Sequence, residues 1–147
     1  MGRLQWFHRG LVLGVAGLVA LTAGIPAQAQ SGNFELELNT ATEVPDACRL
    51  TFVATNATGV ALTSTAYEVA AFNAEGGVTT LLVLEFGELP LSKTRVVQFD
   101  LPDLACTDLS RIVVNGQDQC KSAEGDSDVC MKLLSATSRI PTIRFGL

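Results

Sequence analysis

The chain has 147 residues, of which 15 are acidic and 10 are basic, giving a formal net charge of −5 at pH 7. An acidic protein repels polyanions, so the charge argues against a nucleic acid as partner. The single histidine and the four cysteines restrict the chemistry further.

The first 29 residues have the features of a secretory signal peptide. A basic segment is followed by an apolar run over residues 11–25 and by PAQA at residues 26–29, which ends in a small-x-small cleavage pattern. We expect cleavage after Ala29, which leaves residues 30–147 as one domain. The apolar run is shorter than the ~20 residues of a spanning helix, and no later segment is apolar for long enough, so we expect no membrane span after cleavage. An uncleaved anchor is the alternative.

Cleavage also changes the available chemistry. It removes Arg3, Trp6, His8 and Arg9, which brings the formal charge to −7 and leaves no imidazole. Without histidine the domain lacks Ser-His-Asp and Cys-His catalysis, the usual histidine-bearing zinc sites and histidine-ligated haem or copper. We therefore predict a protein that is not an enzyme and holds no cofactor.

Period-two alternation of apolar and polar residues predicts strands along most of the chain. The first strand spans residues 34–38 and is followed by a turn at Pro45-Asp46. The second begins at Cys48, and after a turn at residues 56–59 the third spans residues 65–73. The apolar residues of each strand fall on one face, which we expect to be buried: Phe34, Leu36, Leu38, Cys48, Leu50, Phe52, Ala54, Tyr67, Val69 and Ala71.

Residues 78–86 are apolar at nearly every position. This composition predicts a strand that is covered on both faces or lies centrally in a sheet. Residues 93–101 return to alternation, with Val97, Phe99 and Leu101 on the inward face.

The last part of the chain is less regular. A strand over residues 109–115 ends at Asn115-Gly116, and an acidic segment follows it. Asp128 is placed to cap a short helix over residues 129–134, although a strand there fits equally well. A last strand over residues 139–145 is restricted to a sheet edge because Pro141 cannot donate a hydrogen bond.

About seven short strands separated by turn residues are typical of an immunoglobulin-like antiparallel β-sandwich. The buried tryptophan of antibody domains is missing, so any kinship within this architecture is distant. A small barrel is the alternative fold.

Four cysteines in a short exported chain predict two disulfides, with three possible pairings. Cys106 and Cys120 bracket the strand at residues 109–115, which separates them, so this pair is disfavoured. In a sandwich the start of the second strand lies near the end of the fifth. We therefore predict the pairs Cys48–Cys106 and Cys120–Cys130. Thiol redox chemistry and a four-cysteine zinc site are poorer alternatives, because the chain has no Cys-x-x-Cys spacing.

Three acidic residues, Glu124, Asp126 and Asp128, alternate inside the loop that Cys120 and Cys130 would close. They form a candidate interaction loop. Together with Asp118 they offer oxygen ligands of the kind that calcium prefers, but the spacing matches no EF-hand, and we favour a solvated loop without a metal.

Two further motifs have ordinary interpretations. Asn56-Ala57-Thr58 fits a glycosylation acceptor and also fits a turn. Carboxylate pairs could serve glycoside hydrolysis without histidine, but aromatic residues that would stack on a sugar are scarce.

The segments CRLTFVATN (48–56), VVQFDLP (96–102) and ACTDLSRIVVNG (105–116), followed by two more cysteines, resemble a group of short exported alphaproteobacterial proteins, the Tat pathway signal sequence domain proteins. The resemblance covers Cys48 to Cys130. It implies a periplasmic location and an immunoglobulin-like fold, and it supplies no activity or functional residue. This chain departs from the group because its leader lacks adjacent arginines.

These features predict a non-catalytic binding or accessory protein of the cell envelope, periplasmic or secreted, whose partner is another envelope protein. Exposed edge strands would offer main-chain pairing to that partner. Two alternatives are an envelope enzyme that depends on carboxylates or calcium, and a structural subunit of an envelope assembly.

Overall fold

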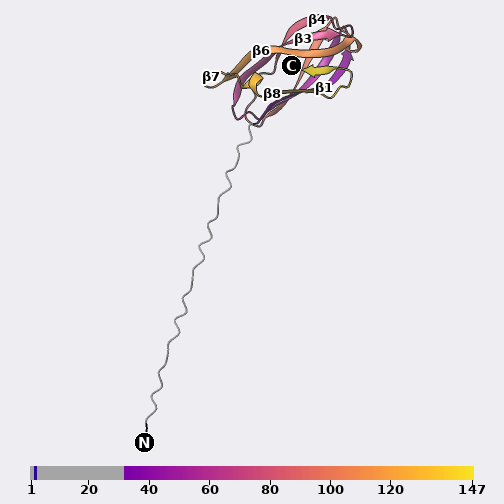
Figure 1. Cartoon of the computed structure of the whole chain (residues 1–147). Coiled ribbons are helices and arrows are strands. Elements are labelled where there is room, and N and C mark those ends of the chain that lie inside the picture. The colour runs from indigo at the N-terminus through magenta and orange to yellow at the C-terminus, as the bar shows by residue number, and fades with distance from the viewer. Residues whose placement is uncertain (1, 3–31) are drawn as a thin grey trace.

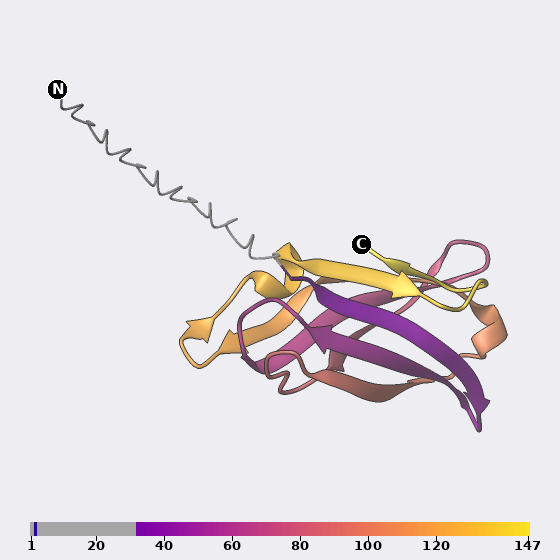
Figure 2. The same cartoon turned by 90° about the horizontal axis from the view of Figure 1, so that it is seen from below.

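A computed structural model of the chain describes Gly2 and residues 32–147, in which two β-sheets pack face to face (Figures 1 and 2). The predicted signal peptide, except for Gly2, lies outside the described residues. Within the described part of the chain, no helix has the length and apolar composition needed to cross a bilayer.

We call the two sheets A and B. Sheet A has the order β5 (Thr94–Pro102), β2 (Ala47–Asn56), β1 (Phe34–Val44), β8 (Leu134–Ser138). Sheet B has the order β4 (Val78–Glu85), β3 (Leu62–Asn73), β6 (Leu109–Ser122), β7 (Gly125–Asp126), and β9 (Arg144–Gly146) also pairs with β6. A 3₁₀ turn, η1 (Cys106–Asp108), precedes β6, and a short helix, α1 (Val129–Lys132), precedes β8.

The predicted all-β sandwich is confirmed, and the barrel alternative is wrong because the strands form two separate sheets. The expectation of a purely antiparallel fold is wrong in two places. β8 runs parallel to β1, as Figure 2 shows, and β9 runs parallel to β6. The immunoglobulin-like relationship stays a prediction.

Alternating burial explains why these segments form strands. The inward residues predicted for the first three strands all have exposed fractions of 2% or less: Phe34, Leu36, Leu38, Cys48, Leu50, Phe52, Ala54, Tyr67, Val69 and Ala71. In β5, Leu101 is buried and Val97 and Phe99 pack partly buried against the core, while Gln98 and Asp100 are exposed. Period two therefore predicted the core face of four strands correctly.

Two strands are longer than the pattern predicts. β1 continues past Leu38 to Val44, with a register shift between Leu38 and Thr40. β6 continues past the predicted turn at Asn115-Gly116 to Ser122, because Gly116 pairs with Glu68 between register shifts. A bulge lets a glycine stay in a ladder where the sequence suggests a chain reversal.

The C-terminal elements also differ from the prediction. The helix over residues 129–134 is shorter and is followed at once by the unpredicted strand β8. Asp128 stands at the helix start but makes no capping hydrogen bond, and its carboxylate binds Lys132 instead. The strand over residues 139–145 is reduced to β9, because residues 139–143 turn around Pro141 and the Ser138 hydroxyl bonds this turn.

Aromatic side chains fill the space between the sheets. The centre of the Phe52 ring lies 6.0 Å from the centre of the Phe86 ring and 5.3 Å from that of the Phe145 ring. Both pairs are arranged edge to face. Tyr67 is fully buried, and its hydroxyl donates to the Cys130 carbonyl oxygen at 2.7 Å. Burial raises the pKa of Tyr67 far above its usual value, so the phenol stays a donor.

The disulfides form the two pairs that strand geometry predicts. Cys48–Cys106 joins the start of β2 to η1, across 58 residues of chain, and Cys120–Cys130 joins β6 to α1, across 10 residues. The described chain has no free cysteine. Two disulfides are typical of proteins that fold in an oxidising compartment outside the cytoplasm.

We expect the two disulfides to contribute unequally to stability. Replacing Cys48 and Cys106 by alanine should lower the free energy of unfolding by about 4 kcal/mol, and replacing Cys120 and Cys130 should lower it by about 3 kcal/mol, because the longer loop restricts the unfolded chain more. Urea unfolding followed by far-UV circular dichroism measures both. A larger loss from the short loop would contradict this order.

Candidate functional site

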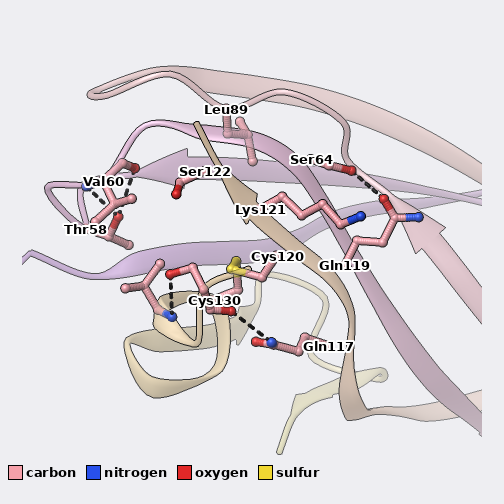
Figure 3. Close-up of a disulfide and its surroundings, with 12 residues drawn as sticks. Thr58, Val60, Ser64, Leu89, Gln117, Gln119, Cys120, Lys121, Ser122 and Cys130 are labelled. Carbon is pink, nitrogen blue, oxygen red and sulfur yellow. Dashed lines mark hydrogen bonds between the residues drawn. A yellow bond between two sulfur atoms is a disulfide. The ribbon is translucent and has the colours of Figure 1, made fainter. Parts of the chain in front are cut away.

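The predicted interaction loop lies at one end of sheet B, around the hairpin between β6 and β7. Glu124, Asp126 and Asp128 are all exposed. Figure 3 shows the Cys120–Cys130 disulfide with Gln117 of β6 nearby. The Gln117 side chain donates to the Ser127 carbonyl oxygen at 3.0 Å. The disulfide and this hydrogen bond restrain the base of the loop and leave its carboxylates in solvent.

The three carboxylates of the loop do not converge. Asp128 forms an exposed ion pair with Lys132 at 2.9 Å, and the hydrogen bond from Lys132 holds the pKa of Asp128 below its usual value. Over the residues that the structure describes, no three Asp, Glu, His or Cys side chains are grouped so that they could hold a metal ion. The calcium alternative therefore gains no support from the geometry.

The Asn56-Ala57-Thr58 motif is a structural turn. Asn56 is fully buried, and its side-chain nitrogen donates to the carbonyl oxygens of Leu89 at 2.7 Å and Val60 at 2.8 Å. Its side-chain oxygen accepts from the Thr58 hydroxyl at 2.7 Å. The amide that a glycan would need is thus inside the protein and already bonded.

The outer face of sheet A is mostly polar, with Val53 and Val96 as an apolar cross-strand pair. Arg49 of β2 donates two hydrogen bonds to Asp100 of β5, at 2.7 and 2.8 Å, and this contact lowers the pKa of the Asp100 carboxyl. Gln98 donates to Thr51 at 3.1 Å along the same strand pair. Cross-strand pairs of this kind give the polar side chains of a solvent-facing sheet their hydrogen-bond partners within the sheet.

The outer face of sheet B is different. Leu81 and Val83 of β4 are 62% and 42% exposed. Leu81 pairs with Ala70 of β3, which pairs with Val113 of β6, so apolar side chains continue across three strands. We call Leu81, Val83, Ala70 and Val113 the apolar face.

Charged residues border the apolar face at both ends. At one end the Arg111 guanidinium lies 4.0 Å above the centre of the Phe72 ring, a cation–π contact. At the other end Glu68 accepts a hydrogen bond from Asn115. The exposed side chains of the apolar face, Leu81 and Val83, therefore have polar groups at both ends.

The position of β4 corrects the sequence prediction. Residues 78–86 were expected to be covered on both faces or central, but β4 is an edge strand of sheet B. Leu84, and Phe86 just after the strand, are buried, whereas Val78, Leu81 and Val83 face solvent. An unbroken apolar run does not distinguish a doubly buried strand from an edge strand with a binding face.

Of the carboxylates near the first turn, that of Glu43 has a structural role. Glu43, Asp46 and Asp103 line a shallow depression beside the Cys48–Cys106 disulfide. Glu43 accepts a hydrogen bond from the Cys106 backbone nitrogen at 2.7 Å, and the Asp103 nitrogen donates to the Asp46 carbonyl oxygen at 2.9 Å. These contacts hold the chain around the disulfide.

No protein-family profile matches the chain, and neither a curated protein nor a solved structure matches it.

Replacing Asn56 by aspartate tests the buried turn. The variant keeps the acceptor for Thr58 but loses both donors, so the carbonyl groups of Val60 and Leu89 face a carboxylate. We expect the free energy of unfolding to fall by about 3 kcal/mol. The control is Asn73→Asp, because Asn73 uses its side-chain oxygen to accept from Gly77 at 2.7 Å, an interaction that aspartate retains.

The control variant should remain within about 0.5 kcal/mol of the unchanged protein. Urea unfolding at pH 7 measures both variants. A loss at Asn56 as small as the one expected for Asn73 would show that the buried amide of Asn56 is dispensable.

Proposed function

We propose that this chain is a non-catalytic binding or accessory protein of the cell envelope, which acts through protein–protein contacts made by β4 and the apolar face. The observation that carries the proposal is the exposure of Leu81 and Val83 on an edge strand, beside Ala70 and Val113. Such a surface favours binding, because covering it removes apolar area from water.

The periplasm is the compartment that best fits the chain. The leader has the charge, apolar run and cleavage pattern of an export signal. The two disulfides favour folding in an oxidising environment. Secretion beyond the envelope is the other destination compatible with the same features.

Two kinds of contact would contribute to binding. Fully burying a leucine or valine is worth about 1.5–3 kcal/mol per side chain, and the exposed portions of Leu81 and Val83 would contribute a share of that. An edge strand adds main-chain hydrogen bonds to an incoming strand. The acidic loop with Glu124, Asp126 and Asp128 lies on the same sheet and would favour a basic segment on the partner.

The two alternatives have less support. An envelope enzyme that depends on calcium needs acidic ligands that converge on the ion, and the described residues contain no group of three acidic side chains placed to hold a metal. A structural subunit would use the same exposed strand, but it predicts that the isolated chain behaves poorly in solution.

Site-specific photo-crosslinking in living cells tests the proposal. A photoreactive residue in place of Leu81 should give a discrete adduct with another envelope protein, because this side chain faces the partner. The matched control is Val96 of β5, which is 63% exposed, close to the 62% of Leu81, but belongs to sheet A. We expect no discrete adduct there. Equal yields at both positions, or none at Leu81, would rule out the apolar face as the binding surface.

A further inference from the structure

Most edge strands of this sandwich are protected against pairing with another chain. β5 carries Arg95 and Asp100 and ends at Pro102. β8 has five residues, β9 has three and β7 has two. Charges, proline and shortness are the usual devices that prevent a sheet edge from recruiting another strand.

β4 has none of these devices. Its eight residues, VTTLLVLE, contain no proline and no lysine, and the one charged residue, Glu85, stands at the last position. The seven preceding residues combine high β-propensity with no charge, which is the composition of segments that pair readily with another strand. An edge of this kind stays soluble when a specific partner covers it.

The sequence of β4 is complementary to itself. In an antiparallel pair centred on Leu82, residues whose numbers lie equally far on either side of Leu82 stand opposite one another. Leu81 of each copy then faces Val83 of the other copy, on the outer side of the sheet. Glu85 faces Thr79, so the two carboxylates are kept apart.

The charges at the two ends of β4 are also complementary. Beyond the end of the strand, Arg95 lies against Gly87 and its guanidinium donates to the Glu88 carbonyl oxygen at 3.3 Å. Before the start of the strand, Glu75 is exposed in the turn between β3 and β4. The same register brings Gly77 of one copy opposite Gly87 of the other, which places Glu75 near Arg95 at both ends of the pair.

We propose that β4 pairs with β4 of a second copy about a two-fold axis at Leu82, which joins two copies of sheet B into one continuous sheet. This inference rests on the proposed function of β4 as an interaction surface and names the partner of its edge. The apolar faces of both copies then lie side by side on the same side of that sheet, and together they form a wider surface for the envelope partner.

Sedimentation equilibrium of the exported, disulfide-bonded protein tests the dimer. We expect reversible dimers at concentrations below about 1 mM. Leu81→Lys should raise the dissociation constant roughly tenfold or more, because each lysine meets apolar Val83 across the pair and both copies carry the change. Val96→Lys adds the same charge at an equally exposed position on β5 and should leave the dissociation constant unchanged.

Val83→Lys provides a second variant in case Leu81→Lys fails to fold, and it should weaken the dimer in the same way. Far-UV circular dichroism of each variant checks that the fold is retained. Hydrogen exchange adds a map of the interface: amide protection over residues 78–85 should rise with protein concentration, whereas protection over residues 94–102 should not.

A protein that stays monomeric up to about 1 mM would overturn the inference. So would a dimer that Leu81→Lys and Val96→Lys weaken equally, or one whose protection lies outside β4. These outcomes are separate from failure of the proposed function. If the protein is monomeric but still crosslinks through Leu81 to another envelope protein, only the proposed dimer is contradicted. If it is dimeric but gives no such adduct, only the proposed envelope partner is contradicted.

Discussion

A two-layer sandwich buries one face of each sheet and exposes the other. The long strands of both sheets meet that constraint on their inner faces, where the rings of Phe52, Tyr67 and Phe86 fill the space between the layers. The outer face of a sheet can be stabilised in two ways. Either polar pairs satisfy it, or another surface covers it.

The two sheets use different solutions. Sheet A covers its outer face with hydrogen-bonded pairs such as Arg49 with Asp100 and Thr55 with Thr94. Sheet B leaves Leu81 and Val83 in water. This asymmetry is the main reason to propose a binding surface on sheet B rather than on sheet A.

The disulfides extend the sandwich to segments that the inner faces alone would hold weakly. Cys130 sits in a helix of four residues, which is too short to be stable by itself. Its disulfide to Cys120, and the bond from the Tyr67 hydroxyl to its carbonyl oxygen, fix that turn against β6. Once α1 is fixed, β8 follows directly and lies along β1.

The sequence by itself determined the inner face of the sheets and the pairing of the cysteines. Both follow from local rules, because side chains alternate at every residue of a strand and an extended strand separates Cys106 from Cys120. Local rules also indicated a turn at the residues around Asn56, but they did not distinguish that turn from a glycan acceptor. The distinction needed Leu89, which lies 33 residues away and accepts from the Asn56 amide.

Only the tertiary structure decided where each strand sits in its sheet. The pattern of residues 78–86 is the same for a central strand and for an edge strand, because the residues of a strand do not specify how many neighbouring strands it pairs with. The lengths of β1 and β6 depended likewise on bulges, which require a partner strand to continue past Asn39 and Gly116. The exposed apolar face is therefore a property of the assembled sheets, because the composition of β4 becomes informative only when its neighbours are known.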